Sequence, residues 1–428
     1  MTTEQEIRAQ AEAAKMASYP LAALQVDVRN MALHAMADAL LGAAGMVLQE
    51  NAADLAAAKD AGMQPSYLDR LRLDMRRISD MAEGLRQTAE LPDPLGREDY
   101  SVRRPNGLEI RRLRVPLGVV GMIYEARPNV TADAIGLCLK SGNAVFLRGG
   151  SDALRSNRAI RDVLSHAAYA AGIPEGAIQL LAIKDRAAVD MMIHLTGLLD
   201  VIIPRGGAGL IRHVTEHSTV PVIETGAGIC HVYVDRAADV EMAIRIVQNA
   251  KVSRPSVCNA AETLLVHAEA AADFLPRMAK ILHADGVELR GCEKTCAILP
   301  DAVPAVEEDW RTEYGALILS IRIVSSIEEA IAHINRYNTG HSETIVTNDI
   351  RAAHIFQHAA DASTVYVNAS TRFTDGFEFG FGAEIGISTQ KLHVRGPMGL
   401  EALTSTKYLV YGEGQVRTSS IANTECCP

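Results

Sequence analysis

The side chain best suited to covalent chemistry is Cys258, one of seven cysteines in this chain of 428 residues. It lies three residues after Pro255, where two stretches of alternating strand-like and helix-like sequence meet. Ligand clefts often form at such junctions. A lone cysteine is more commonly a buried, inert side chain, so position alone leaves both interpretations open. Attack requires the thiolate, and Lys251 and Arg254 are close enough in sequence to favour it.

Two Arg-Gly-Gly sequences follow apolar, strand-like runs and precede helix-like ones. They are Arg148-Gly149-Gly150-Ser151 and Arg205-Gly206-Gly207. Glycines at the end of a parallel strand allow a pyrophosphate to approach the amides of the next helix. The third glycine of a full dinucleotide fingerprint is missing, so a tight strand-to-helix turn is the alternative interpretation.

Other polar residues follow strand-like runs in the same way. Asn129 follows an apolar run at residues 117–123 and could donate to a developing oxyanion or serve a turn. Glu224 enters a glycine turn, which its carboxylate could cap. A polar loop begins at Asn368 and contains Ser370 and Arg372. The Arg372 guanidinium could bind a carboxylate with two hydrogen bonds, or the loop could simply be solvated.

The composition restricts the classes of function. A net charge of −10 disfavours nucleic acid as a partner, although a local cluster of arginines can still attract small anions. The odd, irregular cysteines form no disulfide framework, which indicates a reducing cytoplasm. Cys292 and Cys296 alone do not supply the four ligands of a structural zinc site. No apolar run resembles a signal peptide or a membrane helix, so no membrane partner is expected.

The elements that position these residues can be read from periodicity. Residues 1–90 indicate several amphipathic helices. From residue 117, apolar runs alternate with helix-like segments, which predicts a parallel sheet covered on both faces. A second alternation after residue 259, with a strand expected at residues 296–299, predicts a second α/β domain. Asn106-Gly107 predicts a hairpin within residues 100–115, whose arginines indicate either a solvated edge or a partner-binding arm.

Several segments also resemble one enzyme family. The sequences IPRGG, VPVIETGAG, RPSVCNAAETLLVH, TGHSETIVT and VYVNASTRFTDG are the most distinctive. They are similar to those of γ-glutamyl phosphate reductases, the glutamate-5-semialdehyde dehydrogenases of proline biosynthesis, and more distantly to the aldehyde dehydrogenase superfamily. The resemblance extends from about Arg114 to Tyr408.

The resemblance implies an aldehyde-dehydrogenase-like α/β fold with two doubly wound parallel-sheet domains and a β-hairpin oligomerisation arm. The implied divisions are a cofactor-binding domain of residues 1–99, 116–226 and 396–404, a catalytic domain of residues 227–395, an arm of residues 100–115 and 405–415, and a disordered tail of residues 416–428.

It also implies a mechanism. Cys258 attacks L-glutamyl 5-phosphate and expels phosphate, and hydride from NADPH then reduces the thioester to L-glutamate 5-semialdehyde. Asn129 and the Cys258 backbone N–H form the oxyanion hole, while Glu224 matches the residue that activates water in hydrolytic relatives. The implied cofactor-binding residues are Arg148, Gly149, Ser151, Arg205, Gly206, Gly207 and Glu313. The implied substrate-binding residues are Arg127, Arg254, Asn368, Ser370 and Arg372.

Two other functions stay open. One is a hydrolytic, NAD-dependent aldehyde dehydrogenase with Glu224 as its base. The other is a catalytically silent nucleotide-binding protein on the same fold. The expected partners are a small-molecule substrate, further copies of the chain and, transiently, glutamate 5-kinase. No histidine pattern of a metalloenzyme is present, so no metal is expected.

Overall fold

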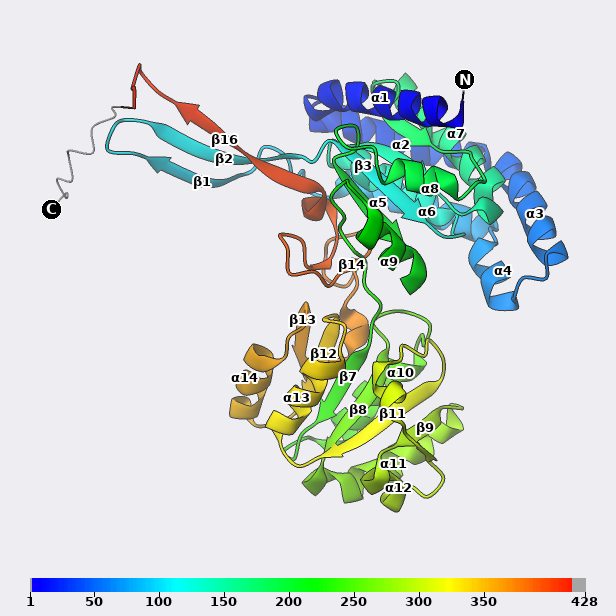
Figure 1. Cartoon of the computed structure of the whole chain (residues 1–428), viewed down its shortest axis with the longest axis vertical. Helices are drawn as coiled ribbons and strands as arrows, with labels where there is room; N and C mark the ends of the chain where they lie inside the picture. Colours follow the sequence, from blue (N-terminus) through cyan, green and yellow to red (C-terminus); the bar gives the residue numbers. More distant parts are fainter. Residues whose placement is uncertain (1, 418–428) are drawn as a thin grey trace.

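The computed structural model describes residues 2–417. The predicted disordered tail, residues 416–428, lies outside this range except for its first two residues. Figure 1 shows two α/β units, one above the other, and a narrow arm that extends sideways from the upper unit. In the described part of the chain no single helix is long and apolar enough to span a membrane, although the bent pair α2 and α3 passes by length and composition.

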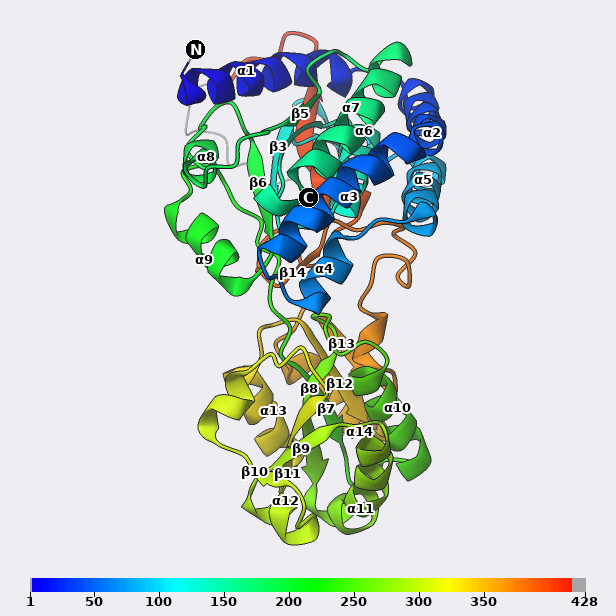
Figure 2. The ribbon, with the colours of Figure 1, turned by 90° about the vertical axis from the view of Figure 1, so that its right-hand side faces the viewer.

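The upper unit begins with a layer of helices and continues into a four-stranded parallel sheet of order β5-β4-β3-β6. Figure 2 shows α8 and α9 on one side of the strands and α6 and α7 on the other. The helices are α1 (Thr3–Ala22), α2 (Val26–Gly42), α3 (Ala44–Asp60), α4 (Pro65–Leu71), α5 (Met75–Glu90), α6 (Asn129–Lys140), α7 (Leu154–Ala170), α8 (Ala187–Met192) and α9 (Ala208–His217). The strands are β3 (Val119–Tyr124), β4 (Ala144–Arg148), β5 (Ile178–Leu180) and β6 (Val201–Arg205).

Burial on both faces explains why these strands appear as apolar runs. Every residue of β3 and β4 is buried. Because β4 ends at Arg148 and β6 ends at Arg205, both Arg-Gly-Gly sequences lie at the carboxyl edge of this sheet. That edge is where an open parallel sheet ordinarily holds its ligand.

The lower unit contains a seven-stranded parallel sheet of order β10-β9-β11-β8-β7-β12-β13. Separate apolar clusters cover its two faces, one with α10 and α11 and the other with α13 and α14. The strands are β7 (Cys230–Val234), β8 (Ala261–His267), β9 (Glu288–Gly291), β10 (Val303–Pro304), β11 (Ile318–Val324), β12 (Ser342–Val346) and β13 (Thr364–Val367). The helices are α10 (Val240–Val252), α11 (Ala268–Ala284), α12 (Glu293–Ile298), α13 (Ile327–Tyr337) and α14 (Ile350–Ala359).

The strand predicted at residues 296–299 is wrong. This stretch belongs mostly to α12, where the Cys296 N–H donates to the Cys292 carbonyl at 2.9 Å. A run of four residues is too short for its periodicity to separate a strand from a buried helical turn. The neighbouring strand is β9, which lies before the helix.

The arm is a three-stranded antiparallel sheet of β1 (Glu98–Arg103), β2 (Glu109–Pro116) and β16 (Thr404–Tyr411). The predicted hairpin is therefore present, and its turn includes Gly107 at a left-handed φ of 87°. β16 returns from the far end of the chain and pairs with β2 along its whole length. A short sheet of β14 (Ile387–Ser388) and β15 (Gly396–Pro397) lies in the segment leading back to the arm.

Candidate active site

Cys258 lies between α10 and β8 and lines a cavity of about 470 Å³ whose walls come from both units. The upper unit contributes the Arg205-Gly206-Gly207 corner, and the lower unit contributes the loop that carries the cysteine. Gly228 packs directly against this loop, since a Cβ at that position would overlap the Cys258 carbonyl group. The sulfur therefore lies where the carboxyl edge of one sheet faces the amino edge of the other.

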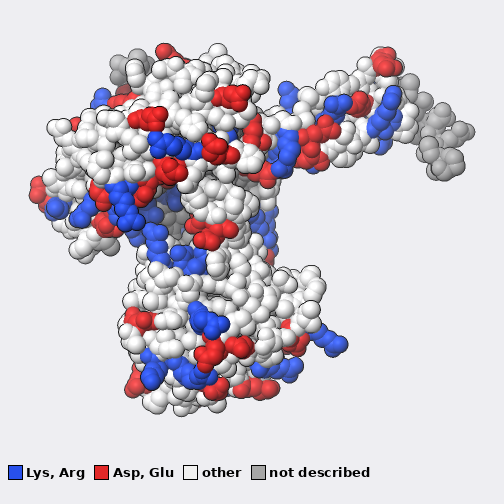
Figure 3. Space-filling model, turned by 180° about the vertical axis from the view of Figure 1, so that it is seen from behind, with Lys and Arg blue, Asp and Glu red and all other residues white. Residues whose placement is uncertain are grey.

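Arginines dominate the charge of this cavity. Figure 3 shows Lys and Arg side chains gathered around the hollow between the two units. Within residues 2–417, none of the arginines that line the cavity forms an ion pair with an acidic side chain; they are Arg70, Arg127, Arg205, Arg254 and Arg372. Burial, followed by repulsion from its neighbours, lowers the pKa of Arg127 and of Arg372. Such a cluster is suited to a ligand with more than one anionic group.

Burial disfavours the ionised form of two of the four carboxyl groups that line this cavity, Glu313 and Glu384. Burial, with a contribution from nearby Asp375, raises the pKa of Glu384 to about 7. Burial also raises the pKa of Glu313, which accepts the Gly228 N–H at 3.1 Å. A carboxyl group that titrates near neutrality is partly uncharged under ordinary conditions, so the cavity has an excess of positive charge.

The Cys258 thiol is itself protonated in this environment. Burial raises its pKa to about 12, with a contribution from Glu313 and Glu384, whereas Arg205 acts in the opposite direction. Lys251, which sequence proximity offered as an activator, does not face the sulfur. Its ammonium donates to the buried Glu262 carboxylate at 2.6 Å.

The nearest base to the sulfur is a residue that sequence reasoning did not single out. His341 Nε2 lies 3.2 Å from Cys258 Sγ, and the imidazole is fully buried. His341 immediately precedes β12, as Cys258 precedes β8 by a few residues, so both lie at the amino edge of the lower sheet. The usual sequence signal for a ligand site is a polar residue after a parallel strand, whereas His341 precedes its strand, so the sequence pattern did not indicate it.

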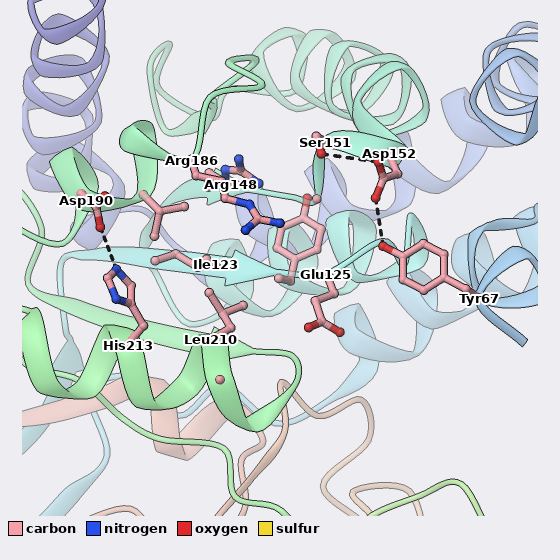
Figure 4. A pocket seen from close by; sticks show the side chains of 14 residues that line it. Tyr67, Ile123, Glu125, Arg148, Ser151, Asp152, Arg186, Asp190, Leu210 and His213 are labelled. Atoms are coloured by element: carbon pink, nitrogen blue, oxygen red, sulfur yellow. Dashed lines mark hydrogen bonds and ion pairs between the residues drawn. The ribbon is translucent and has the colours of Figure 1, made fainter. Parts of the chain in front are cut away.

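A second cavity of about 600 Å³ lies against the upper sheet. Figure 4 shows the guanidinium groups of Arg148 and Arg186 side by side above Ile123, with Ser151 and Asp152 beyond them. Tyr67 donates to Asp152 at 3.0 Å and forms part of the wall. Tyr124 and Glu125 line both cavities, so the two are adjacent.

The second cavity has features that fit an anionic nucleotide. The Arg148 Nε atom is buried and has no hydrogen-bond partner among the described residues, and burial and Arg186 both lower the pKa of Arg148. Gly149, a predicted cofactor-binding residue, is not among the residues that line this cavity, and a Cβ there would collide with the Asn157 amide. Arg186 is a second residue that sequence reasoning missed, because it follows no strand-ending glycine.

The Arg205-Gly206-Gly207 corner already holds an anionic group from the chain itself. The Glu125 carboxylate accepts the Gly207 N–H at 2.7 Å and caps the start of α9. A phosphate that bound at this helix terminus would have to displace Glu125.

Four of the predicted catalytic and substrate-binding residues do not line the cysteine cavity. The exposed Asn129 amide donates to Asp133 at 3.2 Å, and Glu224 exchanges two hydrogen bonds with Gln390. Asn368 pairs with the backbone of Thr347, while Ser370 accepts the N–H of Arg372. Each side chain satisfies a local backbone or polar partner, so their catalytic and binding roles stay predictions.

Comparison with known proteins places this site in a family. A model of the aldehyde dehydrogenase family matches residues 1–288 and 289–408. The chain therefore belongs to the aldehyde dehydrogenase family, an oxidoreductase family that uses nicotinamide cofactors. The predicted fold class is confirmed.

Individual relatives narrow the assignment. A γ-glutamyl phosphate reductase from Moorella thermoacetica is 58% identical over 417 residues, covering 97% of this chain and 100% of the relative. One from Thermoanaerobacter pseudethanolicus is 56% identical over 412 residues, covering 96% and 100%. The crystal structure of the enzyme from Thermotoga maritima superposes with a TM-score of 0.95 at 47% identity, covering 96% and 100%. Within its family the chain thus groups with the γ-glutamyl phosphate reductases of proline biosynthesis, as the sequence resemblance predicted.

Proposed function

We propose that this chain reduces L-glutamyl 5-phosphate to L-glutamate 5-semialdehyde and phosphate with NADPH, through a thioester on Cys258. The observation that carries the proposal is the position of this thiol in a cavity lined by arginines that form no ion pair with an acidic side chain of the described residues. The substrate has an acyl phosphate at one end and an α-carboxylate at the other. An acidic cavity would repel both groups, and a neutral cavity would bury their charges without compensation.

The arginines of the cavity can divide this work between them. Arg127 and Arg205 come from the upper unit, and Arg254 and Arg372 come from the lower one. Arg372 is held by Ser253 Oγ at 3.1 Å and by Asn259, which fixes the direction of its guanidinium. A guanidinium fixed in this way binds a carboxylate or phosphate at a smaller cost in side-chain entropy.

Arg148, Ser151 and Arg186 are suited to hold the cofactor. Two adjacent guanidinium groups favour a nucleotide with an additional phosphate, which supports NADPH over NADH. When bound, the nicotinamide cofactor supplies the hydride that reduces the acyl group. The protein's part is to hold the cofactor next to the cysteine cavity, which shares Tyr124 and Glu125 with the nucleotide cavity.

The remaining chemistry belongs to the loop of Cys258. The sulfur attacks the acyl carbon, and phosphate leaves. The Cys258 backbone N–H and the Asn129 amide are the proposed oxyanion donors, which requires Asn129 to turn away from Asp133. Glu224 is outside the cavity and bonded to Gln390, so its proposed role as a hydrolytic base has no support in this geometry. The proposed homo-oligomer and contact with glutamate 5-kinase rest on the resemblance, and the proposed cytoplasmic location rests on the irregular cysteines.

The test runs the reaction in reverse. Glutamate semialdehyde, NADP and inorganic phosphate are supplied, and the reduced nicotinamide is followed by absorbance. We expect phosphate-dependent turnover that Cys258→Ala abolishes and Cys292→Ala preserves, because Cys292 lies outside both cavities. Cys258→Ala should still bind NADPH. Turnover that ignores phosphate would instead indicate a hydrolytic dehydrogenase, and NADPH binding without turnover in the wild type would indicate a silent protein.

A further inference from the structure

The sulfur of Cys258 and the imidazole of His341 form a closed pair within the lower unit. Nε2 of the histidine is 3.2 Å from Sγ, and no solvent reaches the ring. On the other side, Nδ1 is 2.8 Å from Ser342 Oγ and 3.7 Å from Cys230 Sγ. A buried imidazole with a polar partner at each nitrogen is held in a single orientation.

One direction of the surrounding hydrogen bonds leaves Nε2 of His341 able to accept a proton. Cys230 uses its S–H toward the Cys258 carbonyl at 3.2 Å, so its sulfur can only accept from Nδ1. Ser342 Oγ is 2.7 Å from Thr374 Oγ1, which is 2.8 Å from the Tyr366 hydroxyl. If each hydroxyl donates to the next, Ser342 accepts from Nδ1–H and Nε2 presents its lone pair to Cys258.

We propose that His341 is the general base that takes the Cys258 proton as the sulfur attacks, and that Ser342 positions it by holding the Nδ1–H tautomer. This inference rests on the proposed thioester chemistry at Cys258. No other imidazole among the described residues contacts this sulfur. His341 therefore touches a reacting atom, whereas Ser342 acts through the histidine.

The step balances without any further reactant. The S–H bond breaks as the S–C bond to the acyl carbon forms, and the proton passes to His341 Nε2. The C–O bond to phosphate then breaks, and the phosphate departs with the bonding electron pair. The imidazolium returns its proton to the departing phosphate. The products are the thioester, hydrogen phosphate and a neutral imidazole.

The shifted pKa values favour transfer of the Cys258 proton to His341 during the attack, and not a thiolate–imidazolium pair in the resting protein. Burial raises the pKa of Cys258 to about 12 and lowers that of His341 to about 4, so the resting pair is neutral. The other titratable groups facing the pair are Cys230, Glu313, Glu384, Arg205 and Arg372. Proton transfer in the transition state costs less than first forming a buried thiolate and imidazolium.

The test compares wild type with His341→Gln, which keeps a polar side chain of similar reach but cannot take up a proton. The rate of Cys258 alkylation by iodoacetamide is measured across pH by mass spectrometry. Near neutral pH we expect the variant to react about tenfold more slowly or worse, and reverse turnover to fall by roughly 10²- to 10⁴-fold. As the pH rises, hydroxide replaces the lost base, so the two alkylation rates should converge.

Convergence at high pH separates a lost base from a damaged fold. Ser342→Ala should show a smaller deficit with the same pH dependence. His333→Gln is the matched control, because it removes another buried imidazole that packs against Trp310 and not against the cysteine. Equal rates for His341→Gln and wild type near neutral pH, or a deficit that stays constant with pH, would overturn the proposal. Alkylation needs neither substrate nor cofactor, so failure of the proposed reaction would appear separately, as wild-type protein without phosphate-dependent turnover.

Discussion

At the scale of single residues, the cysteine cavity combines arginines that have no acidic partner among residues 2–417 with two carboxyl groups whose ionisation is disfavoured by burial. Burial penalises the charged form of Arg127 and of Glu384 alike, lowering the pKa of the first and raising that of the second. In a protein without ligand these penalties are not offset. An anionic substrate would offset the free-energy cost of burying the charged arginines. Binding energy can in this way stabilise a site that is costly to fold.

Glu384 offers a test of this cost through the dependence of stability on pH. Its pKa is about 7 in the folded chain, above the ordinary value of 4.5. Between these two values the folded state binds more protons than the unfolded state, so the free energy of unfolding falls as the pH rises through this window. Glu384→Gln should therefore change little below the window and stabilise the protein above it, by roughly 2 kcal/mol.

Urea denaturation on either side of that window measures the difference. The exposed Glu378→Gln is the matched control and should leave stability unchanged at both pH values. An equal stabilisation by Glu384→Gln above and below the window would show that packing, and not the buried charge, accounts for the effect.

At the scale of elements, the sequence predicted strands most accurately where every residue of the strand is buried. β3 and β4 are buried on both faces and appear as continuous apolar runs. β9 has only four residues, of mixed exposure, and gives no clear apolar run. The strand was therefore predicted in the following segment, which is helical. Cys258 could be found from a junction and a resemblance. His341 could not, because what makes it a candidate is a contact with the loop before β8, a strand far away in sequence.

The arm is the element to which the sequence resemblance assigns a role in oligomerisation. On β16 the side chains of Tyr408 and Val410 project from the same face, and they are 57% and 56% exposed. Side chains of this kind on an exposed strand favour association with another chain. We expect the double variant Tyr408→Glu with Val410→Glu to weaken the predicted homo-oligomer by about tenfold or more, since burying each apolar side chain contributes about 1.5–3 kcal/mol.

Light scattering coupled to size-exclusion chromatography gives the mass as a function of concentration. Ser405→Glu places a single glutamate on the opposite face of β16 and should preserve the wild-type mass. An unchanged mass for the double variant would place the interface elsewhere.

At the scale of the whole molecule, the charge is divided unevenly. The chain carries a net charge of −10, yet the cysteine cavity is lined by five arginines without acidic partners among residues 2–417. Figure 3 shows acidic and basic side chains intermixed over the outer surface, with basic ones concentrated around the hollow. The acidic surface disfavours polyanions, while the narrow hollow attracts small anions because its low-dielectric walls limit screening.

This division predicts how salt affects the two substrates of the reverse reaction. Phosphate is an anion, whereas glutamate semialdehyde carries one positive and one negative group and has no net charge. Raising the KCl concentration from about 20 mM to about 500 mM should lower kcat/KM for phosphate by roughly tenfold, because the attraction that gathers it in the hollow is screened. The kcat/KM for the semialdehyde should change much less.

Arg254→Ala should reduce the salt dependence of kcat/KM for phosphate, since it removes one of the attracting charges. Steady-state kinetics at several salt concentrations measure these slopes, and equal slopes for the two substrates would contradict an electrostatic role for the cavity.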